Sequence, residues 1–202
     1  MPPSLTDRRR LGLGLVAAAV VAPGFAHAAR SPQAEAFIAT EGQKVLAMLG
    51  DRGLGEAARQ ARLTQSLDAL ADFQRISSFV LGRHARTLSP PQRQRFNAAF
   101  RSHVQRVFLR QLTAYRGSLL RVTGSTARSP TDVVVNTTVR GSSGDEAVNW
   151  RVLGAAGGFK VADVQARGVW LAITLQQDFV STIDNAGGDV EALIRRLEAG
   201  KG

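Results

Sequence analysis

The chain has 202 residues, no cysteine, and 26 Lys or Arg residues against 16 Asp or Glu residues, which gives a formal net charge of +10. The absence of cysteine excludes a disulfide framework and a lipid anchor attached through a cysteine thiol. A charge this positive indicates an anionic partner, and in the cytosol nucleic acid would be considered first.

The first 28 residues have the pattern of a secretory signal peptide. Three arginines, Arg8 to Arg10, precede an apolar stretch from Leu11 to Ala22, and Ala26-His27-Ala28 fits the small-residue cleavage motif. The arginines fit a twin-arginine export signal as well as the charged region of a general secretory signal. We therefore predict a signal peptide over 1–28 and one domain over 29–202.

An uncleaved membrane anchor is the alternative for this N-terminal segment. About 20 apolar residues are needed to span a bilayer, whereas Pro23 and Gly24 interrupt the run after Ala22. Cleavage would remove one acidic and three basic residues and leave a net charge of +8. We expect the mature protein to diffuse in the periplasm of a Gram-negative bacterium, where nucleic acid is out of reach and anionic lipid surfaces attract basic side chains.

Four helices are predicted in the first half of the mature chain, over about 31–50, 56–70, 72–82 and 89–116. Ser31-Pro32 and Ser89-Pro90 each combine an N-cap residue with proline at the first helical position. The last of the four is the clearest, because a wide apolar stripe follows one face and must lie against other apolar groups. The residues of this stripe are Phe96, Phe100, Val104, Val107, Phe108, Leu112 and Tyr115.

From Ser118 onward the apolar period changes from 3.6 to 2, which predicts strands over about 118–126, 131–140, 146–153 and 159–167. Short polar or Gly-rich turns separate them, so successive strands should pair antiparallel. Two further helices are expected over 170–185 and 189–199. The predicted fold class is α+β, with N-terminal helices packed on a curved four-stranded antiparallel sheet that two C-terminal helices close.

Several segments, taken in order and spacing, match one family. They are Asp72-Phe73-x-x-Ile76, Ser89-Pro90-x-Gln92-Arg93, Val148-x-Trp150-Arg151-Val152, Gly158-Phe159-Lys160-Val161, Gly168-Val169-x-Leu171 and Asp189-x-x-x-Leu193-Ile194. Together they resemble the MlaC family, the periplasmic phospholipid-binding component of the Mla lipid transport system, also called toluene-tolerance auxiliary components. Trp170 and Gln176 depart from the family pattern and, with Leu171 to Thr174, are more similar to its hopanoid-associated branch.

The resemblance implies a lipid carrier with an apolar pocket between helices and sheet. It further implies an inner-membrane ABC transporter complex and an outer-membrane lipoprotein complex as partners. The basic charge predicts transient contact with membrane surfaces, and since the chain contains no metal or cofactor motif, neither a metal nor a cofactor is expected. A phospholipid or a hopanoid-type lipid would be the cargo. Eight residues are candidates for the pocket wall, and four arginines are candidates for contact with the headgroup. The wall candidates are Phe79, Phe100, Val104, Phe108, Tyr115, Val135, Trp150 and Val164, and the headgroup candidates are Arg83, Arg86, Arg121 and Arg151.

Two other functions fit parts of the pattern. An enzyme could use His84, His103, Tyr115, Asp132 or Asp163, but the chain has no G-x-S-x-G, H-E-x-x-H or P-loop motif, and no catalytic activity is predicted. A periplasmic adaptor that binds only protein would have the same helices and strands. Its apolar residues would fill a core, and the purified protein would hold no lipid.

Overall fold

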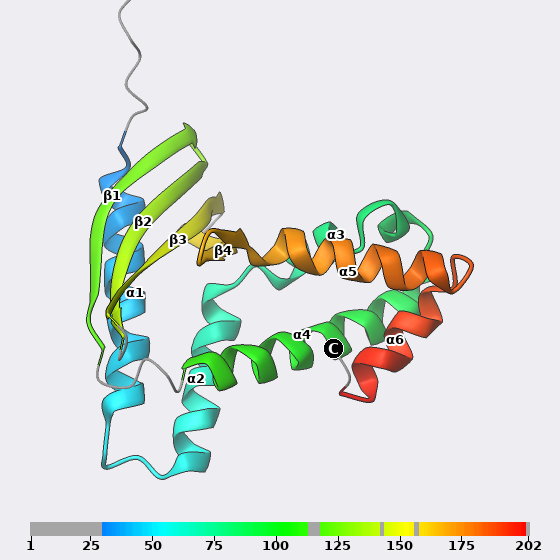
Figure 1. Cartoon of the computed structure of the whole chain (residues 1–202), viewed down its shortest axis with the longest axis horizontal. Coiled ribbons are helices and arrows are strands. Elements are labelled where there is room, and N and C mark those ends of the chain that lie inside the picture. Colours follow the sequence, from blue (N-terminus) through cyan, green and yellow to red (C-terminus); the bar gives the residue numbers. More distant parts are fainter. Residues whose placement is uncertain (1–29, 113–117, 142–143, 156–157, 201–202) are drawn as a thin grey trace, which may run out of the picture.

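The structure, a computed structural model, describes residues 30–112, 118–141, 144–155 and 158–200 (Figure 1). The helices are α1 (Pro32–Gly50), α2 (Glu56–Leu70), α3 (Phe73–Val80), the 3₁₀ helix η1 (Gly82–Arg86), α4 (Pro90–Leu112), α5 (Leu171–Asn185) and α6 (Val190–Glu198). The strands are β1 (Leu120–Ser129), β2 (Asp132–Gly141), β3 (Gly144–Ala155), β4 (Gly158–Ala166) and β5 (Val169–Trp170). The α+β class predicted from the sequence is confirmed.

Helix starts follow the predicted capping residues. The Ser31 hydroxyl accepts a hydrogen bond from the Ala34 amide at 3.3 Å, and the proline that follows occupies the first turn of α1. At α4, the Gln92 side chain accepts from the Ser89 amide at 3.0 Å, while the Ser89 hydroxyl accepts from the Gln92 amide at 3.4 Å. This reciprocal pair is a capping box, which satisfies two N–H groups that the helix itself cannot.

The sheet is an antiparallel meander in the order β1-β2-β3-β4-β5. The register places Val135 opposite Trp150, and Trp150 opposite Val164, so these side chains share one face. The fifth strand was not predicted, and Trp170, assigned from the sequence to the helix, belongs to it. Two residues are too few to show a period, and the strand is revealed by its pairing with β4, where Trp170 lies opposite Gln165 and Val169 opposite Ala166.

The described residues form a hydrophobic core among the helices, a second core between α1 and the sheet, and a smaller cluster between α1 and α2. The helical core surrounds three phenylalanines, where Phe96 stacks on Phe100 at 5.7 Å and both meet the edge of Phe179 at 6.1–6.2 Å between ring centroids. Figure 1 shows α3, α4, α5 and α6 extending away from the sheet. None of the described helices combines the length and the hydropathy required to cross a membrane.

Helix α1 contacts the sheet along only part of its length. Its N-terminal half packs Ala34 and Ile38 against Val133, Val135 and Val152 of the sheet. Its C-terminal half packs Val45, Leu46 and Leu49 against Leu63 of α2, with Leu120 of β1 as the contact from the sheet. The helix therefore moves away from most of the sheet and toward α2 as it proceeds.

Candidate ligand-binding cavity

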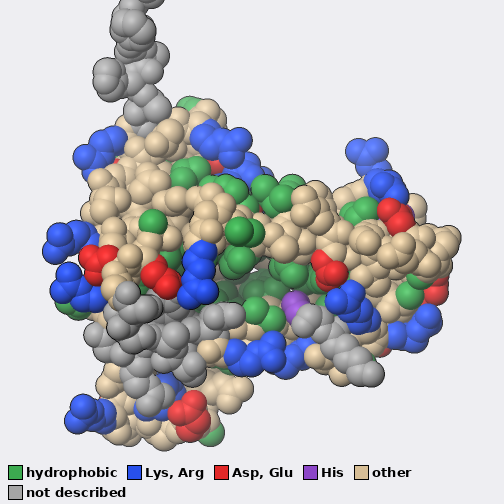
Figure 2. All heavy atoms as spheres, viewed as in Figure 1, with side chains coloured by type: hydrophobic (Ala, Val, Ile, Leu, Met, Phe, Trp, Pro, Cys, Tyr) green, Lys and Arg blue, Asp and Glu red, His purple; other side chains and the backbone are tan. Residues whose placement is uncertain are grey.

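A cavity of about 440 Å³ occupies the space between the sheet, α1 and the C-terminal part of α4. Well-packed interiors contain few voids larger than a water molecule, which takes up roughly 30 Å³ in the liquid, so this volume is too large for a packing defect. Figure 2 shows hydrophobic side chains around the hollow between the sheet and the helices. The wall consists of Ile38, Glu41, Gly42, Val45, Leu46, Leu70, Val107, Phe108, Leu120, Val139, Val148, Trp150, Val161, Val164, Ala166, Arg167, Val169 and Leu171.

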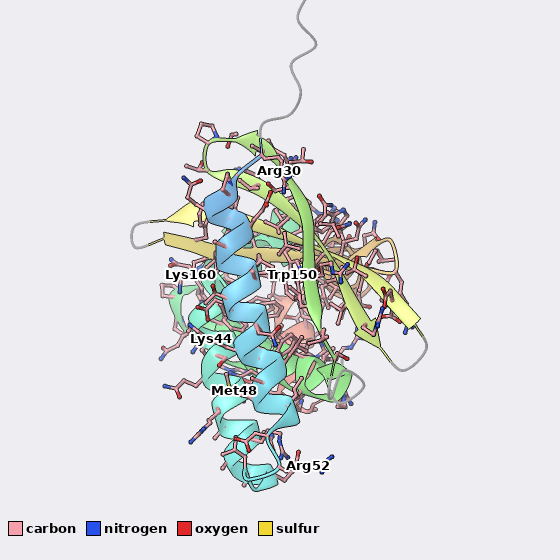
Figure 3. The ribbon with its side chains drawn as sticks, turned by 90° about the vertical axis from the view of Figure 1, so that its left-hand side faces the viewer. Arg30, Lys44, Met48, Arg52, Trp150 and Lys160 are labelled. Atoms are coloured by element: carbon pink, nitrogen blue, oxygen red, sulfur yellow. The ribbon has the colours of Figure 1, made fainter. Side chains whose placement is uncertain are left out.

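The sheet supplies a dry wall because its polar groups are already paired. The indole Nε1 of Trp150 donates to the Thr137 hydroxyl at 3.0 Å, and that hydroxyl donates to the Val148 carbonyl at 2.7 Å. Thr137 is 2% exposed, so both bonds lie out of water. Figure 3 shows Trp150 in the sheet behind α1. With its only N–H satisfied, the indole offers the cavity an apolar surface.

On the opposite side, Gly42 brings α1 close to β1. A Cβ atom at this position would lie 2.8 Å from Cδ1 of Leu120, closer than carbon atoms approach without a shift. Both residues line the cavity. A larger residue at Gly42 would push α1 outward or turn Leu120 into the cavity, so this glycine sets the width of the site.

Three of the eight predicted wall residues, Phe108, Trp150 and Val164, line the cavity. Phe100 and Val135 are fully buried in the helical core and in the core between α1 and the sheet, respectively. The remaining three also lie away from the cavity or outside the description: Val104 packs on the helical core, Phe79 is 39% exposed on α3, and Tyr115 lies outside the described residues. A role in lipid binding stays a prediction for all eight.

The difference arises because α4 runs from the helical core to the cavity. Its apolar stripe predicts burial along the whole helix, but Phe96 and Phe100 face other helices, and among the described side chains of the stripe Val107 and Phe108 line the cavity. Periodicity identifies a buried face without identifying what covers it. The α1 residues of the wall were recognisable as an apolar helix face, yet nothing in the sequence indicated that they border a cavity.

None of the four predicted headgroup arginines lines this cavity, and their contact with a headgroup stays a prediction. Arg121 and Arg151 alternate with residues of the cavity face and so lie on the other face of the sheet, where Arg151 pairs with Asp132 at 2.8 Å. Arg83 forms an ion pair with Asp184 at 2.5 Å in a polar depression beside α5. Arg86 is exposed at the end of η1.

Two charged residues do line the cavity, and the sequence analysis identified neither. Glu41 of α1 is paired with Lys44, with 2.7 Å between Oε1 and Nζ. Arg167, in the turn between β4 and β5, is paired with Glu146 of β3, with 3.2 Å between Nη2 and Oε1. Both cations of these pairs are more than half exposed, which places the pairs toward water and away from the apolar wall.

Of the titratable groups proposed for an enzyme, Tyr115 lies outside the described residues, His84 and His103 lie among the helices, and Asp132 and Asp163 belong to the sheet near Arg151. The His84 ring nitrogen Nε2 lies 2.9 Å from an Asp184 oxygen, whereas His103 is buried in the helical core against Phe179. Burial, together with the nearby Arg106, lowers the pKa of His103. Among the described residues, no group of three or more His, Asp or Glu side chains is arranged to hold a metal ion.

Asp163 has a structural role at the junction of sheet and helix. Its Oδ1 accepts hydrogen bonds from the Val164 amide at 2.8 Å and from the Ala172 amide, in the first turn of α5, at 2.9 Å. Burial raises the pKa of this carboxyl group despite the two hydrogen bonds. Its hydrogen-bond partners are backbone amides, which fix α5 to β4, and Arg151, directly opposite on β3, adds an electrostatic attraction.

The fold can be compared with known proteins. A family model described as MlaC protein matches residues 40–199. Among solved structures, the phospholipid-binding protein from Ralstonia solanacearum, in complex with a phospholipid, superposes with a TM-score of 0.73 at 29% sequence identity. That alignment covers 84% of this chain and 96% of the other. No curated protein matches the sequence.

Proposed function

Because the chain belongs to the MlaC family, we propose that it is a periplasmic carrier that holds the acyl chains of a phospholipid in the cavity between sheet and helices. The observation that carries the proposal is the cavity itself, about 440 Å³ with fifteen hydrophobic residues in its wall. This volume falls in the range of about 300–1,000 Å³ typical of small-molecule sites. The phospholipid held by the Ralstonia solanacearum protein supports the same class of ligand.

The energetics of a lipid tail explain why a carrier needs such a wall. Each methylene costs about 0.8 kcal/mol to expose to water, so a 16-carbon chain costs on the order of 12 kcal/mol. A wall that includes Trp150, Phe108 and Val164 gives the tail an apolar environment similar to the interior of a bilayer. Transfer to and from a bilayer is then close to isoenergetic, and it requires no bond to be made or broken.

The location and the partners belong to the proposal as well. An exported protein of net charge +8, after loss of the predicted signal over 1–28, would be drawn to anionic lipid surfaces. We propose that it exchanges lipid with an inner-membrane ABC transporter complex and an outer-membrane lipoprotein complex. In such a cycle the partners set the direction, because the carrier itself favours neither membrane.

The identity of the cargo is tested by extraction. The mature protein, purified from the periplasm without detergent, is extracted with organic solvent, and the extract is analysed by mass spectrometry. We expect phospholipid in an amount that approaches one molecule per chain. A hopanoid in its place would revise the lipid class, while a protein that folds normally but yields no lipid would overturn the carrier function and favour a protein-binding adaptor.

A further inference from the structure

One arginine stands at the rim of the cavity. Arg167 is the only cationic residue among the described residues of the wall, and its neighbours Ala166 and Val169 line the cavity as well. Its side chain is 81% exposed, so the guanidinium group reaches water while the backbone adjoins the apolar wall. A lipid whose tails fill the cavity must leave its headgroup at such a boundary.

The backbone holds this arginine in an unusual conformation. Arg167 has φ +51° and Gly168 has φ +80°, the left-handed pair of a two-residue hairpin turn that Asn-Gly and Gly-Gly adopt most readily. Of the described residues, Arg167 alone is a non-glycine residue with positive φ. The Gln165 side chain donates to the Gly168 carbonyl at 3.0 Å and anchors the turn. Turn stability would favour glycine at 167, so the backbone conformation gives no reason for an arginine at this position.

The charges around the rim allow an exchange of anions. Glu146, the ion-pair partner of Arg167, lies on β3 two residues before Val148 and four before Trp150, on the face that lines the cavity. An ion pair with a cation this exposed contributes little to stability. A phosphodiester that replaced the carboxylate would keep the charge of the arginine balanced, and guanidinium binds phosphate oxygens in a bidentate manner.

From this placement we propose that Arg167 binds the phosphate of the cargo lipid at the cavity rim and so gives the protein a preference for phospholipids over uncharged lipids with the same tails. The inference rests on the proposed lipid-carrier function and adds its headgroup specificity. It assigns to Arg167 the role that the sequence analysis gave to Arg83, Arg86, Arg121 and Arg151, none of which lines the cavity.

The test compares two lipids with matched tails, dioleoyl-phosphatidylglycerol and dioleoylglycerol, binding to delipidated protein. The variant is Arg167→Gly, which suits the positive φ and should melt at the wild-type temperature or slightly above it. Arg52→Gly is the control, since it makes the same substitution at an exposed residue beyond the C-terminal end of α1 (Figure 3). Arg167→Lys, with a cation that lacks the planar fork, should give an intermediate result.

We expect the wild-type protein and Arg52→Gly to prefer phosphatidylglycerol, and Arg167→Gly to lose about tenfold of that preference with unchanged affinity for dioleoylglycerol. An unchanged ratio of the two affinities in a folded Arg167→Gly variant would overturn the inference while the carrier function stands. If the wild-type protein binds neither lipid, the proposed function and the inference fall together.

Inorganic phosphate separates a headgroup site from a site for the isolated anion. A rim that recognises phosphate only as part of a lipid should leave the melting temperature of the delipidated protein unchanged when phosphate is added. A rise in melting temperature with phosphate that Arg167→Gly abolishes would instead identify a site for the anion itself and contradict the headgroup assignment.

Discussion

The helical core and the cavity are built from the same kinds of residue but differ in what fills them. In the helical core, Phe96, Phe100 and Phe179 meet one another at ring distances of 5.7–6.2 Å and leave no room. In the sheet region, Trp150 and Val164 face about 440 Å³ of space, because α1 moves away from the sheet toward α2. Apolar composition therefore does not decide whether a region is filled or hollow; the paths of the covering helices do.

Truncation of a phenylalanine should separate the two regions most strongly. Phe100→Ala removes a side chain with 0% exposure from a close-packed core and should lower the free energy of unfolding by about 3–5 kcal/mol. Phe108→Ala is the matched variant on the same helix, and it should cost clearly less because one side of Phe108 already borders a cavity. Urea denaturation of the lipid-free proteins measures both losses, and equal losses would contradict the distinction.

Added volume should have the opposite pattern. Val152→Trp, at a site with 0% exposure between α1 and the sheet, should destabilise the protein by about 1–3 kcal/mol through overpacking. Val164→Trp extends into the cavity and should leave the melting temperature of the lipid-free protein nearly unchanged while it reduces the amount of lipid recovered by extraction. A Val164→Trp variant that is as unstable as Val152→Trp would show that the cavity is not available space.

Asp163, at the junction of the two regions, should distinguish hydrogen bonding from charge. Asp163→Ala leaves the amides of Val164 and Ala172 without their acceptor and should cost about 0.5–2 kcal/mol, as the loss of a helix cap does. Asp163→Asn keeps an acceptor oxygen, so its free energy of unfolding should equal that of the wild-type protein in acid, where the Asp163 carboxyl group is protonated and neutral.

The difference in stability between Asp163→Asn and the wild-type protein should depend on pH, because the pKa of Asp163 is raised in the folded state. The raised pKa means that the folded state holds the proton more tightly than the unfolded state, so the stabilisation is complete below about pH 4, the unfolded pKa, and is lost as pH rises through the folded value. The free energy of unfolding of Asp163→Asn should therefore rise relative to that of the wild-type protein between about pH 4 and about pH 7. A difference in the free energy of unfolding that stays constant over this range, measured by urea denaturation, would contradict a raised pKa of Asp163.

Substitution of Asp132, on the outer face of the sheet, should change stability least. The pH dependence of this change should be opposite to that at Asp163. The two hydrogen bonds from Arg151 lower the pKa of Asp132, so its contribution is present above about pH 4 and is lost as pH falls through the folded pKa. Because Arg151 is 35% exposed, Asp132→Asn should cost no more than about 1 kcal/mol at pH 7. Urea denaturation at pH 7 and pH 3 measures the difference in the free energy of unfolding between the wild-type protein and Asp132→Asn, and this difference should be smaller at pH 3.

Most of the fold was predictable because its signals are local. Ser31-Pro32 and Ser89-Pro90 mark helix starts through capping, and the alternation of apolar residues in 131–140 gives β2 directly. The two-residue strand β5 carries no period, so Trp170 was assigned to the helix that follows it.

The site was less predictable because it depends on which elements meet. Phe100 and Phe108 belong to one apolar stripe of α4, yet Phe100 is fully buried within the helical core, whereas Phe108 packs at the edge of that core and also lines the cavity. Arg167 was missed because its sequence context is a short turn, and its importance comes from the cavity beside that turn. Strand alternation could have excluded Arg151, since its neighbour Trp150 was already assigned to the inner face.

The central claim, that lipid tails occupy the cavity and not the helical core, can be tested by photo-crosslinking. A phospholipid with a diazirine in one acyl chain is loaded into the protein and irradiated, and the labelled positions are mapped by mass spectrometry after digestion with trypsin. Because trypsin cleaves after arginine, the residues of the helical core and of the cavity fall in different peptides. We predict label in peptides 107–110, 141–151 and 161–167, which contain Phe108, Trp150 and Val164, and none in peptide 96–101. Label concentrated in 96–101, or spread evenly over all four peptides, would contradict the account.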